Sequence, residues 1–203
     1  MTQTFSETLR EQRWDDHRLY HHSRVNQSLH FFSALCFLTS YVLLFIEPVW
    51  AVMVAWTLAM VSRQVGHFFF EPKGYDEVNG ASHAEKEAIK VGYNLKRKVV
   101  LLSFWAASLV ALLIDPTLLG ILEPPTSTYG FLTNLSILWA VVAATGLLFR
   151  TVQLCFVRDV QASVVWFTKI LTDPFHDVKI YHASPLALLR GEKFDPMEPW
   201  PAR

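Results

Sequence analysis

The sequence predicts an all-α, polytopic membrane protein with about four transmembrane helices and with cytoplasmic helical segments at both ends. Three observations predict this class. Apolar residues make up 52% of the chain and aromatic residues 14%. Four segments without charge have the length or the apolar character of helices in a bilayer. The lysines and arginines are confined to the two ends of the chain and to the loop between the second and third apolar segments.

The four apolar segments end at recognisable breaks. Glu47-Pro48 separates the first from the second, so these two form a tight hairpin. The second continues as a helix through Phe70, because the stretch "SRQVGHFFF" contains no helix terminator. The third ends at Asp115-Pro116 and the fourth at Arg150. The segments comprise residues 29–46, 49–62, 99–114 and 129–149.

The cations are sorted to one side of these segments. All 18 Lys and Arg residues lie in residues 1–28, 63–98 and 150–203, whereas the turns at 47–48 and 115–128 contain none. By the positive-inside rule, both termini and the middle loop are cytoplasmic. The expected location is a bacterial inner membrane or the endoplasmic reticulum. A soluble all-α bundle is the alternative, but it offers no reason for this sorting.

The same pattern divides the chain into three parts. Residues 1–28 form a cytoplasmic amphipathic N-terminal helix. Residues 29–149 form the four-helix transmembrane domain, which includes the inner loop 63–98. Residues 150–203 form a cytoplasmic or interfacial tail.

The polar parts also contain helix signals. Capping boxes, "TFSE" at residues 4–7 and "SHAE" at residues 82–85, predict two helix starts. The second of these helices is expected to run into the third crossing. Residues 151–171 predict a helix that extends the fourth crossing or lies at the interface, and an irregular chain is expected from Thr172 onward.

The histidines gather on the predicted inner side. His30 and His67 lie within about a turn of the hydrocarbon boundary, where a polar group needs partners, and the tight hairpin returns them to the same depth. His21 and His30 would point in opposite directions on one unbroken helix. They converge if the chain bends near Ser23, a residue suited to an N-cap. The eight histidines are His17, His21, His22, His30, His67, His83, His176 and His182.

A carboxylate belongs to the same neighbourhood. Arg63, His67 and Glu71 follow at intervals of four residues and share one helix face. Pro72 is expected to stop this helix and to hold Glu71 in an extended conformation at the rim. Imidazoles gathered with a carboxylate suit a transition metal, and iron is the metal that we favour.

The remaining histidines have simpler interpretations. His17 fits a polar helix face, and His83 fits the solvated start of a capped helix. His176 and His182 are additional candidates as metal ligands. To reach the site, they would need the tail to fold back toward it. The formal net charge of zero gives no support for binding to nucleic acid.

Two stretches, "YHHSRVNQSLH" and "QVGHFFFE", closely resemble the fungal endoplasmic-reticulum 2-hydroxy fatty acid dioxygenase family of phytosphingosine breakdown and its bacterial relatives. The family pattern is a His, eight residues, a second His that opens a membrane helix, and a later Gly-His-x-x-Phe-Glu block. In this chain the pattern comprises His21, His30 and residues 66–71. The resemblance covers roughly residues 17–71.

The resemblance implies an iron(II)-dependent dioxygenase that shortens a 2-hydroxy fatty acid, or a similar lipid at the membrane interface, by one carbon. The hydroxyl and carboxylate of the substrate would chelate Fe(2+), and dioxygen would be the second substrate. The organic substrate supplies the electrons, so that 2-oxoglutarate is not required.

The resemblance also implies roles for individual residues. His21, His30 and His67 would bind the iron, and Glu71 would be a fourth ligand or would orient a ligand imidazole. The implied catalytic residues are His22, Asn26, Arg63 and Glu71.

Other groups would surround the ligands or hold the substrate. Tyr20, His22 and Asn26 would pack around the metal ligands. Arg63, or a lysine among residues 96–98, would hold the substrate carboxylate.

Two other classes stay open at this point. The chain could be a non-catalytic membrane subunit or scaffold, either as a homo-oligomer or with a membrane partner protein. It could also be another metal-dependent lipid hydroxylase or desaturase, with a mononuclear or dinuclear site. Those enzymes carry several HxxH boxes, and this sequence has none.

Overall fold

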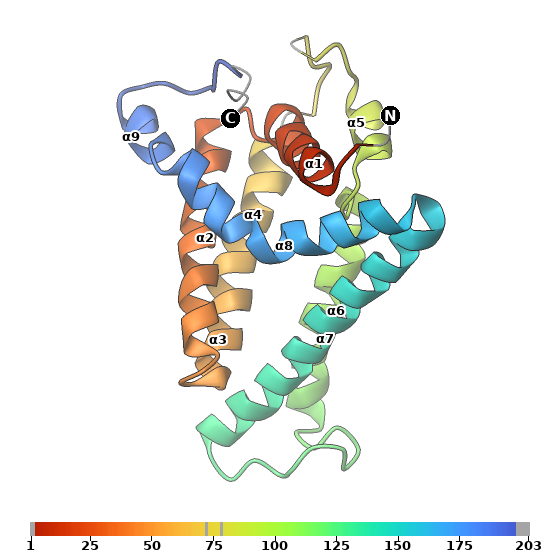
Figure 1. Ribbon diagram of the computed structural model, residues 1–203. Helices are drawn as coiled ribbons and strands as arrows, with labels where there is room; N and C mark the ends of the chain where they lie inside the picture. Colours follow the sequence, from red (N-terminus) through yellow and green to blue (C-terminus); the bar gives the residue numbers. More distant parts are fainter. Residues whose placement is uncertain (1–2, 72, 78, 198–203) are drawn as a thin grey trace.

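The computed structural model describes residues 3–71, 73–77 and 79–197. Within these residues the secondary structure is helical, apart from two isolated β-bridges, Ser23–Phe194 and Asp76–Ala81. Two long helical hairpins form the body of the molecule, and the polar segments before, between and after them gather at one end (Figure 1). The prediction of an all-α fold is confirmed.

The first hairpin is built from α2 (Arg24–Leu43) and a continuous helical rod from Pro48 to Phe70. Pro48 occupies the first turn of the rod, where its missing N–H has no helical partner to lose. The break at Glu47-Pro48 and the helical continuation through Phe70 are both confirmed. The rod alternates between α and wider π turns: α3 (Pro48–Val54), η1 (Ala55–Met60), α4 (Val61–Val65) and η2 (Gly66–Phe70).

The second hairpin consists of α6 (Leu95–Ile114) and α7 (Thr128–Val157), and tryptophans join it to the first. The rings of Trp56 and Trp105 stack with their centroids 5.7 Å apart. Trp56 donates its indole N–H to the carbonyl of Trp139 at 3.1 Å, and Trp139 donates to the hydroxyl of Ser108 at 3.1 Å. Trp56 and Trp139 thereby satisfy their indole N–H groups inside an apolar core.

Among the described residues, three helices are long and apolar enough to cross a membrane: Pro48–Phe70, Leu95–Ile114 and Thr128–Val157. The first of the four predicted crossings lies in α2, which is not among the three. Its helix opens with a polar turn that contains Asn26 and Gln27, and its helical part ends before the apolar run does. The length and hydropathy of the helices therefore support three of the four predicted crossings.

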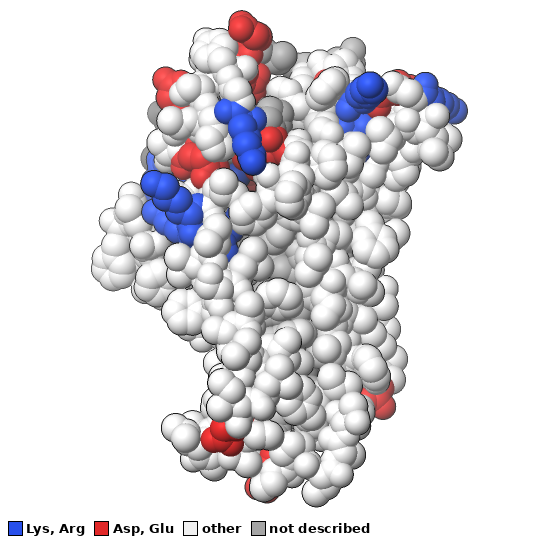
Figure 2. Space-filling model, turned by 180° about the vertical axis from the view of Figure 1, so that it is seen from behind, with Lys and Arg blue, Asp and Glu red and all other residues white. Residues whose placement is uncertain are grey.

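The polar helices lie at one end of the molecule (Figure 1). The capping boxes predicted at Thr4 and Ser82 are both present. On the face seen in Figure 2, Lys and Arg gather at this end, and only acidic groups mark the other end. These helices are α1 (Phe5–Tyr20), α5 (His83–Ile89), α8 (Val160–Tyr181) and α9 (Ser184–Leu189).

Two predicted elements differ from the structure. The helix that starts at Ser82 does not run into the third crossing, because α5 ends at Ile89 and α6 begins anew with Asn94 as its N-cap. The tail is not irregular from Thr172 onward, since α8 continues through Pro174 to Tyr181. Packing of α8 against α2 and α7 outweighs the one helical hydrogen bond that the proline removes. Pro72, the predicted helix stop, lies outside the described residues.

Helix α8 is tied to the first hairpin and to α1 by buried ion pairs. Arg13 of α1 lies 3.2 Å from Asp173 of α8, and Lys169 of α8 pairs with Asp16 of α1 while lying 2.7 Å from Asp173 on its own helix. Asp177, one turn further along, pairs with Arg63 of the rod. Burial acts to lower the pKa of Lys169, but Asp16 and Asp173 outweigh it and raise that pKa above its ordinary value. Because a buried charge without its partner is costly, these pairs fix where α8 lies.

The tryptophan core predicts a difference between two otherwise similar substitutions. Trp56→Ala removes a buried, stacked indole and should lower the free energy of unfolding by about 3 kcal/mol. Trp50→Ala removes an indole that is 47% exposed and should cost less than about 1 kcal/mol. Denaturant titration of both variants in detergent micelles measures the difference, and equal losses would contradict this description of the core.

Candidate metal centre

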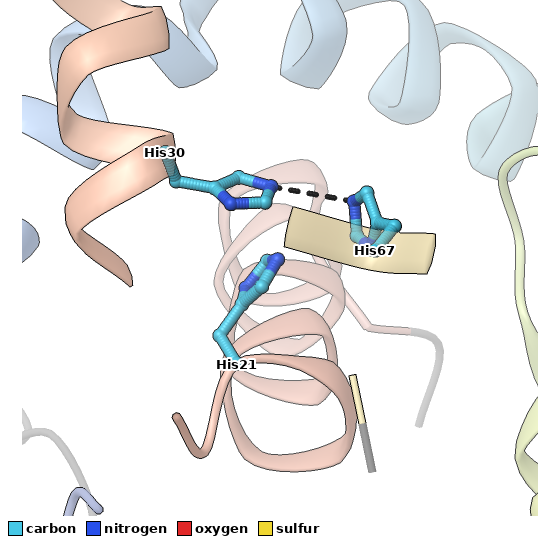
Figure 3. Close-up of side chains that lie close together, drawn as sticks. All are labelled: His21, His30 and His67. Atoms are coloured by element: carbon cyan, nitrogen blue, oxygen red, sulfur yellow. Dashed lines mark hydrogen bonds between the residues drawn. The ribbon is translucent and has the colours of Figure 1, made fainter. Parts of the chain in front are cut away.

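Three histidines from separate elements meet at the polar end of the first hairpin. One nitrogen from each of His21, His30 and His67 lies within 4.8 Å of the others. The ring centroids are 4.2 Å apart for His21 and His30, 4.8 Å for His30 and His67, and 5.3 Å for His21 and His67. Figure 3 shows the three rings facing a common point, and all three side chains are buried.

A break between α1 and α2 brings the first two imidazoles together. His21 caps the end of α1, and Ser23 is the N-cap of α2 with an extended backbone. The chain therefore bends between them, as the sequence predicted, although the Ser23 side chain makes no capping hydrogen bond. The bend lets His21 approach His30, whereas on a continuous helix residues nine apart would face away from each other.

A glycine lets the rod approach α2 closely enough to add His67. A Cβ at Gly66 would lie 2.2 Å from Oδ1 of Asn26 and 3.3 Å from the ring of His30. Asn26 has little room to move, because it is fully buried and its Nδ2 donates to the carbonyl of Tyr20 at 2.8 Å. The glycine before the histidine is therefore required by the packing of two helices.

The outer nitrogen of each imidazole has its own partner. His30 Nδ1 lies 3.0 Å from the carbonyl of Asn26, and His67 Nδ1 lies 2.7 Å from Oε2 of Glu71. His21 Nδ1 lies 2.9 Å from the hydroxyl of Tyr181. Since carbonyl and carboxylate oxygens only accept, His30 and His67 carry their protons on Nδ1 and expose the lone pairs of Nε2.

Glu71 stands between His67 and a lysine. Its backbone is extended, with ψ at 130°, as the sequence predicted. One carboxylate oxygen contacts His67, and Lys90 Nζ lies 3.5 Å from the other while also lying 3.6 Å from the centre of the Tyr20 ring. Burial raises the pKa of Glu71 above its ordinary value, while Lys90 and Lys98 act to lower it.

Tyr181 of α8 is a part of the centre that sequence reasoning missed. Its hydroxyl lies between His21 Nδ1 at 2.9 Å and His17 Nδ1 at 3.2 Å, and its side chain is fully buried. Burial lowers the pKa of His17 to about 4 and that of His21 well below its ordinary value. The tail does fold back to the site, a possibility that the sequence left open, but the side chain that it delivers is a tyrosine. No spacing signal links residues 160 positions apart in the chain.

The inner nitrogens suit a transition metal. His30 Nε2 and His67 Nε2 face each other at 3.3 Å, and His21 Nε2 is buried with no hydrogen-bond partner. Two imidazole nitrogens bound to one ion at about 2.1 Å would lie roughly 3.0–3.4 Å apart. Imidazoles that hold a metal through one nitrogen and a polar group through the other are the usual arrangement in metalloproteins. The three side chains therefore fit a metal ion.

Other predicted site residues lie elsewhere. His22 contacts the carbonyl of Arg18 and lies 3.5 Å from Asp76, so it faces the loop after the rod. Arg63 pairs with Asp177. Neither additional candidate joins the three imidazoles: His176 is half-buried on α8, and His182 is exposed with Nδ1 3.0 Å from the carbonyl of Lys179.

The close approach at Gly66 gives a direct test of the packing. Gly66→Ala should lower the free energy of unfolding by about 1–3 kcal/mol, because the added methyl overlaps the pinned Asn26 side chain. This loss exceeds the helix-propensity gain of about 1 kcal/mol. Gly74→Ala is the matched control, since a Cβ there meets nothing within 4 Å. Unfolding in detergent measures both, and a neutral Gly66→Ala variant would refute the contact.

Comparison with known proteins agrees with the motifs. The family model described as "Mpo1-like: 2-hydroxy-palmitic acid dioxygenase Mpo1-like" matches residues 8–74, about a third of the chain. No curated protein and no solved structure matches the chain. The matched segment contains the three imidazoles and Glu71, whereas Tyr181 lies outside it. The predicted resemblance is confirmed over residues 8–74, which match the Mpo1-like family model.

Proposed function

We propose that this protein is an iron(II)-dependent dioxygenase that removes one carbon from a 2-hydroxy fatty acid at the membrane interface. The observation that carries the proposal is the convergence of three buried imidazole nitrogens from His21, His30 and His67. The family match over the same segment supports iron and a 2-hydroxy acid as the metal and the substrate class.

The proposed reaction is balanced by the substrate and dioxygen alone. One 2-hydroxy acid and one dioxygen give the acid shortened by one carbon, one carbon dioxide and one water. The hydroxy acid provides all four electrons, so no further reductant is needed. Bound iron would supply the site at which the hydroxy acid and dioxygen meet.

The residues around the imidazoles have defined tasks in this proposal. His21, His30 and His67 would hold the ion through Nε2. Glu71 keeps His67 oriented by accepting its Nδ1–H, and Lys90 balances the charge of that carboxylate. Glu71 is thus better placed to orient a ligand than to be a fourth one. The exclusion of water by the buried site protects the reacting groups from side reactions.

The substrate carboxylate needs a cation, and Lys98 is our choice. Arg63 already pairs with Asp177, whose pKa burial raises to about 6 although Arg63 acts to lower it. Lys96 is exposed. Lys98 is half-buried, and no carboxylate of the described residues lies within ion-pair distance of it.

Tyr181 would fix the orientation of His21. If His21 offers Nε2 to the ion, its Nδ1 must carry the proton and donate to the tyrosine hydroxyl. The hydroxyl proton can then be donated to His17 Nδ1, which lies 3.2 Å away. In this arrangement a residue outside the family segment positions a ligand inside it.

The membrane arrangement that we propose has four crossings with both termini cytoplasmic. Alongside the three apolar helices, α2 would be the fourth. Its buried side chains are mainly polar, including His30 and Ser33, whereas Phe32 and Leu35 are exposed. That inverted pattern is expected of a helix that faces lipid. It would place the imidazoles where a lipid carboxylate meets water.

The first test concerns the three imidazoles. His21→Ala, His30→Ala and His67→Ala should each abolish iron loading while leaving the helical content unchanged, because every variant removes one of three buried ligands. Metal analysis and circular dichroism of the detergent-purified variants measure both quantities. His182→Ala is the matched control, since His182 is exposed and lies outside the cluster. Iron retained near the wild-type level in all three variants would refute the metal centre.

The activity itself needs a product assay. Wild-type protein supplied with a 2-hydroxy fatty acid, ferrous iron and air should yield the acid that is one carbon shorter. The same incubation without iron, or with His67→Ala, should yield none. Protein that binds iron but never forms the shortened acid would favour the non-catalytic alternative.

The role of Tyr181 can be measured by metal affinity. Tyr181→Phe keeps the ring and removes the hydroxyl, so affinity for ferrous iron or cobalt should fall by roughly 10- to 100-fold. The cobalt absorption spectrum should change as well, because the orientation of one ligand is lost. Tyr41→Phe is the control, since Tyr41 also links α2 to α8 through one hydrogen bond, to the carbonyl of Leu171 at 3.1 Å. An unchanged affinity and spectrum in Tyr181→Phe would exclude this role.

A further inference from the structure

A second polar hollow lies apart from the imidazoles, where α5, α6 and α7 meet. Its volume is about 370 Å³, within the range of small-ligand sites. It lies at the first turns of α6 and the last turns of α7, the ends of two of the three apolar helices. The lining residues include Lys90, Asn94, Arg97, Arg150 and Arg158.

The charge of this hollow is strongly positive. Four cations line it, against the single carboxylate of Glu87. That carboxylate is already engaged, because one oxygen accepts the backbone N–H of Leu95 at 2.7 Å and the other lies 3.6 Å from Lys90. The hollow therefore lacks an anion of its own.

The arginines have no acidic partners in the described part of the chain. Arg150 is only 4% exposed, and its guanidinium donates to neutral groups, the carbonyls of Val91 and Gly92 and the side chain of Gln153. Arg97 and Arg158 are exposed, and no described carboxylate lies within ion-pair distance of either. Three guanidinium groups facing one hollow repel one another unless an anion enters.

The neighbouring surface identifies the kind of anion. On α6, below the hollow, Val100 is 56% exposed and Phe104 is 63% exposed. On α7, Phe149 and Val152 are 62% and 56% exposed. These side chains form an apolar flank that can contact acyl chains while the headgroup lies among the cations. Figure 2 shows the same arrangement on the face drawn there, with cations above a long uncharged surface.

We propose that this hollow, which Arg97, Arg150 and Arg158 line, binds the phosphate of an anionic phospholipid whose acyl chains lie along α6 and α7. Basic pockets between membrane helices at the inner side are suited to such headgroups. Arginine forms bidentate hydrogen bonds with phosphate, which gives the site specificity as well as charge. The three arginines lie outside the imidazole cluster, which the hollow adjoins only through Lys90, the partner of Glu71, and the proposal does not depend on the proposed reaction.

The test uses the full chain in neutral detergent. Phosphatidic acid, phosphatidylcholine or inorganic phosphate is titrated separately, and binding is followed by thermal stabilisation and by lipid retention in native mass spectrometry. Phosphatidic acid should bind and stabilise the protein, while phosphatidylcholine should bind much more weakly. Stabilisation by inorganic phosphate at the same concentrations would overturn the assignment to a lipid.

Paired variants locate the site. Arg97→Gln with Arg158→Gln should weaken phosphatidic acid binding by roughly 25-fold, about fivefold for each exposed charge removed. Both side chains are exposed, so the variant should fold. Lys96→Gln with Arg190→Gln removes the same charge from exposed positions outside the hollow and should change binding less than about twofold. Equal weakening by both pairs would mean general surface attraction and would refute the site.

Discussion

The structure depends on one close approach between two helices. Gly66 of the rod lies against Asn26 and His30 of α2, and a single added carbon there would lie 2.2 Å from the Asn26 oxygen. Because the two helices lie so close together, His30 Nε2 and His67 Nε2 are only 3.3 Å apart. The same asparagine holds the end of α1 through the Tyr20 carbonyl and orients His30 through its own carbonyl. Packing, helix direction and imidazole orientation are thus set at one contact.

Burial determines the chemistry available at this contact. Burying an imidazole nitrogen without a hydrogen-bond partner costs free energy. The outer nitrogens are satisfied by a carbonyl, a carboxylate and a phenol, which come from three different segments. The inner nitrogens face one another and contact no other polar group, so their lone pairs repel. A metal ion between them would remove this repulsion and stabilise the cluster. The arrangement resembles that of known metal sites in its ligands and in the groups behind them.

Helix α8 connects this centre to the rest of the molecule. Helix α8 lies outside the family segment, yet Asp177 and Tyr181, one turn apart, reach Arg63 and His21. The ion pairs of Lys169 with Asp16 and of Asp173 with Arg13 hold the same helix against α1. The hydroxyl that contacts the outer nitrogen of His21 therefore comes from a helix outside the matched segment. Arg63 is engaged by the same helix, which is why we propose a lysine rather than Arg63 for binding the substrate carboxylate.

The sequence by itself determined the helices of the two hairpins, the breaks between them and the three imidazoles. Local rules suffice for these, since caps, Pro positions and apolar runs act over a few residues. Only the tertiary structure decided what surrounds them. Tyr181 and Lys90 are far from the histidines in sequence, so no periodicity could select them. Helix α8 persists through Pro174 because its packing on α2 and α7 outweighs a local signal. Burial and long-range pairing, which no short stretch of residues encodes, decided the partners of each buried group.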